Sequence, residues 1–218
     1  MDDVTSEVYS AFCVEEEGTM SSFTSVSDVI GSKSLFCSLY ADIVSHYWHT
    51  PMAGGKADKN NLTQFGRALA HLGIELIPAY SSEASDRSER MFGTLQNRLP
   101  QELRLKGIRT MEEANLFLKE EYLLVHNENF TIEPYGDGSV FVPFAGDLTN
   151  VLCVHKDRLV GKDNTVRYKN RCLQILADCH RNHYVKARVR VHEYPNGQLA
   201  IFHGPKKACL IQSRWNGD

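Results

Sequence analysis

Residues 35–42 read LFCSLYAD, and residues 85–95 read SDRSERMFGTL. The first stretch is an apolar run that ends at Asp42, and this pattern is typical of a buried strand. In the second stretch Ser85 can cap a helix, with Glu89 close behind it. A strand end and a helix start can meet at one edge of a sheet. We therefore predict that the two acids converge on one divalent cation, because carboxylate oxygens are the ligands that Mg²⁺ prefers.

Simpler interpretations of these acids stay open. Asp42 can be an ordinary turn residue, and Glu89 can stabilise a helix N-terminus with Arg90 as its partner. His46 and His49 have the i, i+3 spacing of zinc ligands on a helix, but no further histidine or cysteine nearby completes a set. A structural or DNA-contacting role is therefore the prediction for His46.

The rest of the first 135 residues alternates between helix and strand patterns. The first patterns predict an extended, strand-like segment at 4–14, a helix at 21–30 that Gly31 ends, and a buried strand at 34–41. A loop at 50–61 follows, then a helix that Asn61 caps and Gly73 ends, and a strand at 74–77 that Pro78 ends. The last two elements are a helix at 85–99, which stops before Pro100, and a helix with a capping box of Thr110 and Glu113. Two of these helices have an apolar face at helical spacing. In the helix that Gly73 ends, the face consists of Leu62, Phe65, Leu69 and Leu72; in the helix with the capping box, it consists of Ala114, Phe117, Leu118 and Tyr122.

Beyond a boundary at 136–148 the pattern changes to short strands and turns. Strands are expected at 151–154, 159–160, 166–168, 172–176, 185–191 and 198–202, and this spacing predicts a small all-β barrel over 149–218. The dipeptide Asn196-Gly197 is a strong hairpin signal. Along Val185–Val191 apolar residues alternate with Lys186, Arg188 and Arg190, which gives one core face and one basic face.

Charge divides at the same place. Residues 1–149 carry 11 Lys+Arg and 22 Asp+Glu, so 11 − 22 = −11, and residues 150–218 carry 13 and 5, so 13 − 5 = +8. A basic C-terminal part suits a polyanion, although a solvated basic face without a partner gives the same count. Phosphate contacts are predicted for His180–His183, Lys186, Arg188 and Arg190.

Composition excludes other classes of protein. No apolar run reaches 18 residues, and the acidic N-terminus is unlike a signal or transit peptide. The six cysteines show no C-x-x-C pair and are interpreted mostly as small apolar residues in a reducing compartment.

Several short motifs together carry a resemblance to a known family. They are LYAD at 39–42, SHY at 45–47, HTP at 49–51, GGK at 54–56, LTQ at 62–64, GRAL at 66–69, LGIE at 72–75, IPAYS at 77–81 and RSERMFGTLQ at 87–96. This stretch resembles the catalytic core of insertion-sequence transposases of the retroviral-integrase-like DDE superfamily, of the ISNCY type. The likeness continues through 151–168 and 185–204.

The resemblance implies an α/β fold, namely an RNase H-like integrase core missing its first strand over 1–135, a linker at 136–148 and a DNA-binding, SH3-like β-barrel over 149–218. It implies divalent-metal-dependent cleavage and transfer of DNA strands with Mg²⁺ or Mn²⁺, Asp42 as the second acid of the metal triad and Glu89 as the third. DNA contacts are then expected at His46, Arg87, Arg90, Lys186, Arg188 and Arg190. Transposon ends and target DNA are the expected partners, together with self-association or an intact transposase, in the bacterial cytoplasm and at the nucleoid.

The chain also departs from the family pattern. The family's first acid is expected upstream of Met1, with Asp3 as the nearest stand-in, and the family's basic residue and glycine after the second acid are replaced by Ile43-Val44. Asp86 stands where the family favours a small residue. A cooperative site that lacks one carboxylate loses most of its rate enhancement, so we expect little strand transfer from the chain alone. The alternatives are a non-enzymatic DNA-binding fragment that regulates or interferes with an intact transposase, and a relic without function.

Overall fold

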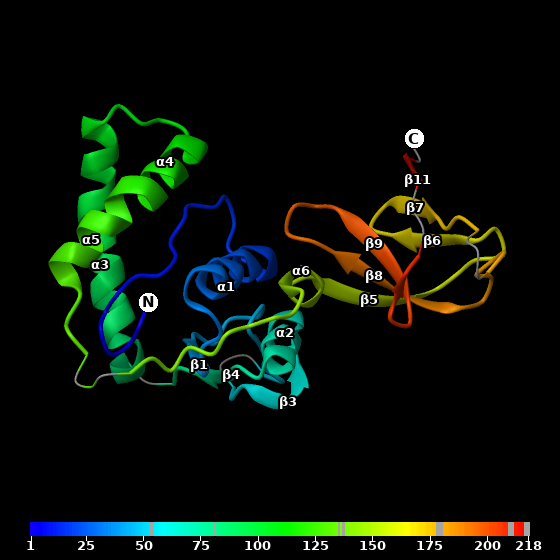
Figure 1. The fold of residues 1–218 in the computed structure, drawn as a ribbon, viewed down its shortest axis with the longest axis horizontal. Helices are drawn as coiled ribbons and strands as arrows, with labels where there is room; N and C mark the ends of the chain where they lie inside the picture. The colour runs from blue at the N-terminus through cyan, green and yellow to red at the C-terminus, as the bar shows by residue number, and fades with distance from the viewer. Residues whose placement is uncertain are drawn as a thin grey trace. The chain divides into compact units, whose positions relative to one another are not determined.

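The computed structural model describes residues 1–52, 55–80, 82–134, 136, 138–177, 181–208 and 212–215. The chain divides into two compact units, Met1–Gly146 and Asp147–Asp218. Figure 1 draws the first as a mixture of helices and short strands and the second as mainly strands. Within the described ranges, no helix has both the length and the apolar character needed to cross a bilayer.

The first unit is built around two parallel strands, β1 (Ser38–Ala41) and β4 (Glu75–Pro78). Their register runs from Ser38 opposite Glu75 to Ala41 opposite Pro78, so both strands end at the same edge. Between them in sequence come an antiparallel pair, β2 (Trp48–His49) and β3 (Asp58–Leu62), and the helix α2 (Gln64–Leu72).

Helix α2 ends as the sequence predicts but begins differently. Gly73 takes the left-handed conformation, with φ 74°, that stops the helix. The N-terminal cap is Thr63, whose hydroxyl accepts from the Gly66 amide, and not Asn61, because Asn61 lies within β3. Leu62 is exposed for the same reason, whereas Phe65, Leu69 and Leu72 form the buried face.

The helix α1 (Thr19–Lys33) packs on α2 through aromatic rings. Phe23, Val26 and Ile30 are buried on one face of α1, which confirms the predicted face. The Phe23 and Phe65 ring centroids are 6.0 Å apart. Gly31 does not stop α1; the helix continues to Lys33, and Ser34 with φ 88° ends it.

Three predicted features of this unit are wrong in their extent. The strand at 34–41 is only Ser38–Ala41, and of these four residues only Ala41 is buried, because β1 has a single strand neighbour. The loop at 50–61 contains β3, which pairs with β2 despite its polar side chains. The strand at 74–77 runs from Glu75 through Pro78, since a proline is tolerated at the end of a strand.

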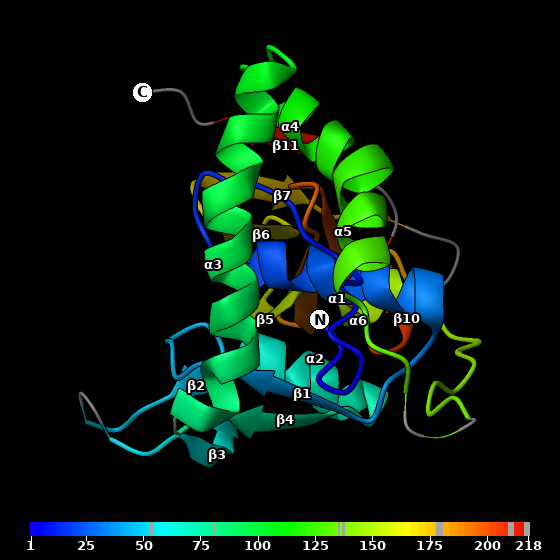
Figure 2. The ribbon, with the colours of Figure 1, turned by 90° about the vertical axis from the view of Figure 1, so that its left-hand side faces the viewer.

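A helical segment completes the first unit: α3 (Ser82–Leu105), α4 (Met111–Phe117), the π-helical turn η1 (Leu118–Tyr122) and α5 (Leu123–Phe130). Figures 1 and 2 show α3 and α5 side by side. The predicted capping box is confirmed, because Thr110 accepts from the Glu113 amide and Glu113 reaches back to the Thr110 amide. The predicted face is confirmed as well, with Ala114, Phe117, Leu118 and Tyr122 all buried.

The predicted stop of the third helix before Pro100 is wrong. Helix α3 passes through Pro100 and ends at Leu105, near Gly107 with φ 70°. A proline inside a helix costs about 3 kcal/mol, because it removes a hydrogen bond and crowds the preceding turn. Leu99 and Leu103 lie on either side of it and pack against the core of Phe117 and Tyr122. Burial of these apolar side chains offsets the cost of the proline.

The segment 4–14 is not a strand. Its backbone is held at two points by asparagine side chains instead of a strand partner. Asn127 accepts from the Val8 amide at 2.9 Å and donates to the Val8 carbonyl at 3.0 Å. Asn115 makes the same pair of bonds with Cys13, at 2.6 and 3.0 Å. Alternation of side chains favours extended chain, but the sequence does not say which group will satisfy its amides.

We expect Asn127→Ala to release this segment from α5. The substitution removes both hydrogen bonds to the Val8 backbone, and Val8 itself is buried. The free energy of unfolding should therefore fall by about 1–3 kcal/mol. Hydrogen exchange at the Val8 amide should speed up strongly. Asn129→Ala is the matched control, because Asn129 donates to the Val125 carbonyl of its own helix. Equal protection of the Val8 amide in the two variants would contradict the attachment of the segment by Asn127.

In the second unit the described strands form two sheets. One has the order β10-β9-β8-β5 and the other β11-β7-β6. Their bounds are β5 Val154–Leu159, β6 Thr165–Tyr168, β7 Arg171–Gln174, β8 Arg188–Glu193, β9 Leu199–His203, β10 Lys206–Lys207 and β11 Gln212–Trp215. The core between them contains Val166 and Leu173 from one sheet and Val189, Val191 and Ile201 from the other.

Three predicted strands in this unit, at 166–168, 172–176 and 198–202, correspond to β6, β7 and β9, but the other three differ. The strands expected at 151–154 and 159–160 are replaced by one strand, β5, which covers the residues between them. Residues 148–151 form a short helix, α6 (Leu148–Val151), because Asp147 caps it by accepting from the Thr149 amide. The strand expected at 185–191 begins only at Arg188, after Lys186 with φ 60°. The Asn196-Gly197 turn does join β8 to β9, with Gly197 at φ 76°. The hydrogen bonds of the described strands leave two open sheets and no closed cylinder.

Candidate active site and nucleic-acid interface

Asp42 lies at the edge where the parallel strands end. It follows Ala41, the last residue of β1, and its side chain is exposed. The Ala79 amide donates to the Ala41 carbonyl at 3.0 Å, so β4 leaves the sheet directly beside Asp42. Helix α3 begins three residues later at Ser82, and Figure 2 shows its first turns next to the ends of β1 and β4.

Glu89 lies on α3, but not in its first turn. The helix begins at Ser82, earlier than the cap predicted at Ser85, so Glu89 is seven residues along it. At 1.5 Å per residue this is about 10 Å along the helix axis. Its side chain is exposed. Asp42 and Glu89 therefore belong to elements that meet at one edge of the sheet, but the predicted place of Glu89 in the first turn of its helix is wrong. Convergence of the two acids on one cation stays a prediction.

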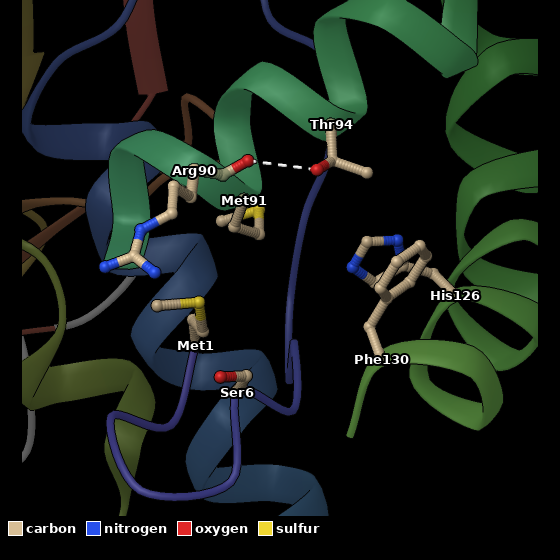
Figure 3. A pocket seen from close by; sticks show the side chains of 7 residues that line it. All are labelled: Met1, Ser6, Arg90, Met91, Thr94, His126 and Phe130. Atoms are coloured by element: carbon tan, nitrogen blue, oxygen red, sulfur yellow. Dashed lines mark hydrogen bonds between the residues drawn. The ribbon is translucent and has the colours of Figure 1, made fainter. Parts of the chain in front are cut away.

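Arg87 and Arg90 lie near Glu89 on α3. The Arg87 side chain lies outside the described residues. Arg90 is exposed and lines a pocket of about 170 Å³ together with Met1, Ser6 and His126. In Figure 3 the Arg90 guanidinium points away from His126.

The loop after Asp42 is fixed by an aromatic and acidic cluster. Tyr47 packs on Phe65, with ring centroids 4.9 Å apart, and its hydroxyl accepts from Ser22 at 3.2 Å. Burial raises the pKa of Tyr47, and the negative charges of Glu17 and Asp42 raise it further. The phenol therefore lies within the electrostatic reach of Asp42.

His46 is turned toward this cluster. Its Nε2 atom is 3.4 Å from a Glu17 carboxylate oxygen, and its ring lies 4.1 Å from that of Tyr47. In the sequence Glu17 reads only as part of the acidic turn Glu15–Gly18, and nothing there relates it to His46. Glu17 and Asp42 thus both act on the Tyr47 phenol, so two negative charges lie near the loop that follows Asp42.

The basic residues predicted to contact DNA lie along the start of β8. Arg188 and Arg190 are exposed, whereas Val189 and Val191 are buried, so the predicted division into a basic and an apolar face is confirmed for these four. Lys186 is exposed just before the strand. Of the group His180–His183, His180 lies outside the described residues, and Arg181 stacks over the Tyr184 ring at 5.3 Å.

Pairing of β8 with its neighbouring strands brings two further charged residues, Asp157 and Lys207, to the face of Arg190. Asp157 of β5 is opposite Arg190, and the Arg190 Nε donates to its carboxylate at 2.8 Å. This bond holds the pKa of Asp157 below its usual value. Because Arg190 pairs with Phe202, and Phe202 with Lys207, Lys207 belongs to the same face as Arg190. Register between strands is not visible in a single strand's alternation.

Two known proteins match most of the chain. One, from Sinorhizobium fredii, is named as a candidate transposase, y4bF; it is 31% identical over 207 residues, covering 92% of this chain and 44% of its own length. The other is the transposase of the insertion sequence IS1202 from Streptococcus pneumoniae, 27% identical over 79% of this chain and 37% of its own length. The chain is similar to transposases.

This similarity to transposases covers both candidate sites. The match with y4bF leaves 100 − 92 = 8% of the chain outside it, so it spans Asp42, Glu89 and Arg188–Arg190. The chain itself spans less than half the length of these two relatives. No protein-family model matches it.

Proposed function

We propose that this chain is a DNA-binding segment of a transposase and contributes two carboxylates to a metal-dependent DNA-cleaving site. The observation that carries the proposal is the similarity to y4bF over 92% of the chain, which includes both acids. The local structure supports it, because Asp42 is exposed at a sheet edge beside the start of the helix that carries Glu89.

The donor chemistry at this edge fits a hard cation. Asp42 and Glu89 would hold Mg²⁺ or Mn²⁺, with the negative charge of Glu17 nearby. A bound divalent ion neutralises charge on a scissile phosphate and activates the attacking oxygen. His46 and Arg90 are the neighbours proposed to contact the DNA backbone, with Arg87 from the same helix. The resemblance to the transposase family further implies an RNase H-like core in the first unit and an SH3-like arrangement of the two open sheets in the second, and both are part of this proposal.

The second unit is proposed to supply affinity for DNA. Arg188 and Arg190 project charge from one face of β8, a central strand of its sheet, and Lys186 is exposed just before it. Exposed cations held on a sheet are suited to phosphate contacts. Arg190 exchanges its bond with Asp157 for a phosphate at little cost, because both side chains are more than half exposed.

Salt dependence of DNA binding tests this assignment. The logarithm of the association constant with duplex DNA should fall linearly with the logarithm of salt, with a slope of about −0.9 per phosphate contact. We expect the double variant Arg188→Gln/Arg190→Gln to flatten that slope by about 1.8, since it removes two contacts. Fluorescence anisotropy of a labelled duplex provides the measurement.

Lys59→Gln/Lys119→Gln is the matched control, because it also removes two exposed cations, but from the first unit. Its slope should equal that of the unaltered chain. A flat salt profile for the unaltered chain, or an equal change in both double variants, would contradict DNA binding through β8. Binding without metal-dependent cleavage would favour the alternative, a non-enzymatic fragment that regulates an intact transposase.

A further inference from the structure

Three side chains that bind borderline-soft metals gather on one face of the second unit. One ligand atom of each of Cys153, His155 and His192 lies within 4.8 Å of the other two. Cys153 and His192 are buried, and His155 is half-buried. This cluster contains neither Asp42 nor Glu89 and lies in the other unit of the chain.

Strand register explains why three residues so far apart in sequence meet. In the antiparallel pair β5–β8, His155 is directly opposite His192, so the two side chains share a face. Their rings stack with centroids 4.0 Å apart and an interplanar angle of 18°. Cys153 lies in the bend between α6 and β5, two residues before His155, and this bend brings its thiol to the two rings.

The surroundings orient two of the three candidates. The Asn150 carbonyl accepts from the Cys153 thiol at 3.4 Å and lies 3.0 Å from the His155 Nε2 atom. When His155 donates to this carbonyl from Nε2, its Nδ1 keeps the lone pair that a metal needs, the usual role of such an outer hydrogen bond. Tyr194 donates to the Asn150 side chain at 2.8 Å and so fixes the carbonyl in turn.

Apolar side chains restrict water around the cluster. The Phe202 ring stacks on His192 with centroids 4.2 Å apart. Cys153 packs with Tyr194 and Ala200 in a small core of its own. A thiolate and two imidazoles in mostly buried surroundings favour a borderline cation over Mg²⁺, which prefers carboxylate and water oxygens.

We propose that Cys153, His155 and His192 bind one zinc ion. A tetrahedral zinc with these ligands separates the donor atoms by roughly 3.3–3.6 Å, given Zn–S near 2.3 Å and Zn–N near 2.0–2.1 Å. The ligand atoms of the structure lie within 4.8 Å of one another, and metal binding requires rotation of the side chains that unstacks the two rings. The ion ties the turn after α6 to β8, and a fourth position is left for water.

Metal content and cobalt spectroscopy test the site directly. The chain is stripped with a chelator, incubated with Zn²⁺ alone and gel-filtered, and we expect one zinc per chain. With Co²⁺ in its place, a thiolate-to-cobalt charge-transfer band should appear, because only a bound cysteine sulfur produces it. Cys153→Ser should abolish that band, and His192→Gln should weaken zinc binding about tenfold or more, equivalent to ~1.4 kcal/mol.

Controls separate metal binding from loss of fold. Cys172→Ser and His183→Gln alter a cysteine and a histidine of the same unit outside the cluster, and both should keep one zinc. His155→Gln is a second variant of the cluster that should weaken zinc binding. His155 is only half-buried, so its replacement disturbs the core less than that of Cys153. A chain that takes up no zinc, a cobalt complex without the charge-transfer band, or equal zinc in all variants would overturn the proposal. None of these readouts depends on DNA binding or cleavage.

Discussion

Asp42→Asn is expected to weaken Mn²⁺ binding to the chain by about tenfold or more, ~1.4 kcal/mol or greater. Asparagine keeps the shape of the side chain but removes the negative charge, and the attraction between opposite charges in contact near a protein surface is several kcal/mol. Glu89→Gln should act in the same direction. Free Mn²⁺ measured by electron paramagnetic resonance during a titration gives the affinity.

Glu75→Gln is the control for that experiment. Glu75 is an exposed acid on β4, but it pairs with Ser38 at the opposite end of the two parallel strands. Its replacement should leave Mn²⁺ affinity unchanged, although it alters net charge by the same amount. If Glu75→Gln and Asp42→Asn weaken Mn²⁺ binding equally, the effect is one of total charge, and the strand-end metal site is wrong.

Phe65→Ala is expected to lower the free energy of unfolding of the first unit by about 3–5 kcal/mol. Phe65 is 1% exposed and contacts both the Phe23 and the Tyr47 rings, so its removal leaves a cavity between α1, α2 and the loop after Asp42. Urea unfolding can be followed by Trp48 fluorescence in a Trp215→Phe background, which makes the signal specific to the first unit.

Phe92→Ala provides the comparison for the core substitution. Phe92 is 56% exposed on α3, and truncation of an exposed side chain away from the core should change stability by about 0.5 kcal/mol or less. Similar losses for Phe65→Ala and Phe92→Ala would mean that the aromatic cluster does not hold α1 and α2 together. Tyr47 packs on Phe65 and lies in the loop that follows Asp42. Because Phe65→Ala removes this support for the loop, the variant should also weaken Mn²⁺ binding.

Local chemistry predicted the features that depend on a few neighbouring residues. The capping box of Thr110 and Glu113, the glycine stop at Gly73 and the turn at Asn196-Gly197 are each decided within four or five residues, and each is confirmed. Buried faces at helical spacing were predictable for the same reason. The alternation of Arg188–Val191 was visible because one strand face is core.

Features that depend on distant partners were not predictable. Pro100 lies inside α3 because Leu99 and Leu103 pack on a later helix, and no local rule contains that contact. The segment 4–14 is held by Asn115 and Asn127, more than a hundred residues away. The same holds at the candidate sites, where Asp42 and Glu89 stood out as acids at element ends, but Glu17, Asp157 and Lys207 needed the tertiary structure.

The attachment of the N-terminal segment by Asn115 and Asn127 uses only main-chain atoms of the segment. Each primary amide bonds the N–H and the C=O of a single residue, so these bonds do not depend on which side chain that residue has. Substitutions from Val8 to Cys13 therefore leave both pairs of hydrogen bonds available. Proline at either fastened position is the exception, because its ring nitrogen has no hydrogen to give.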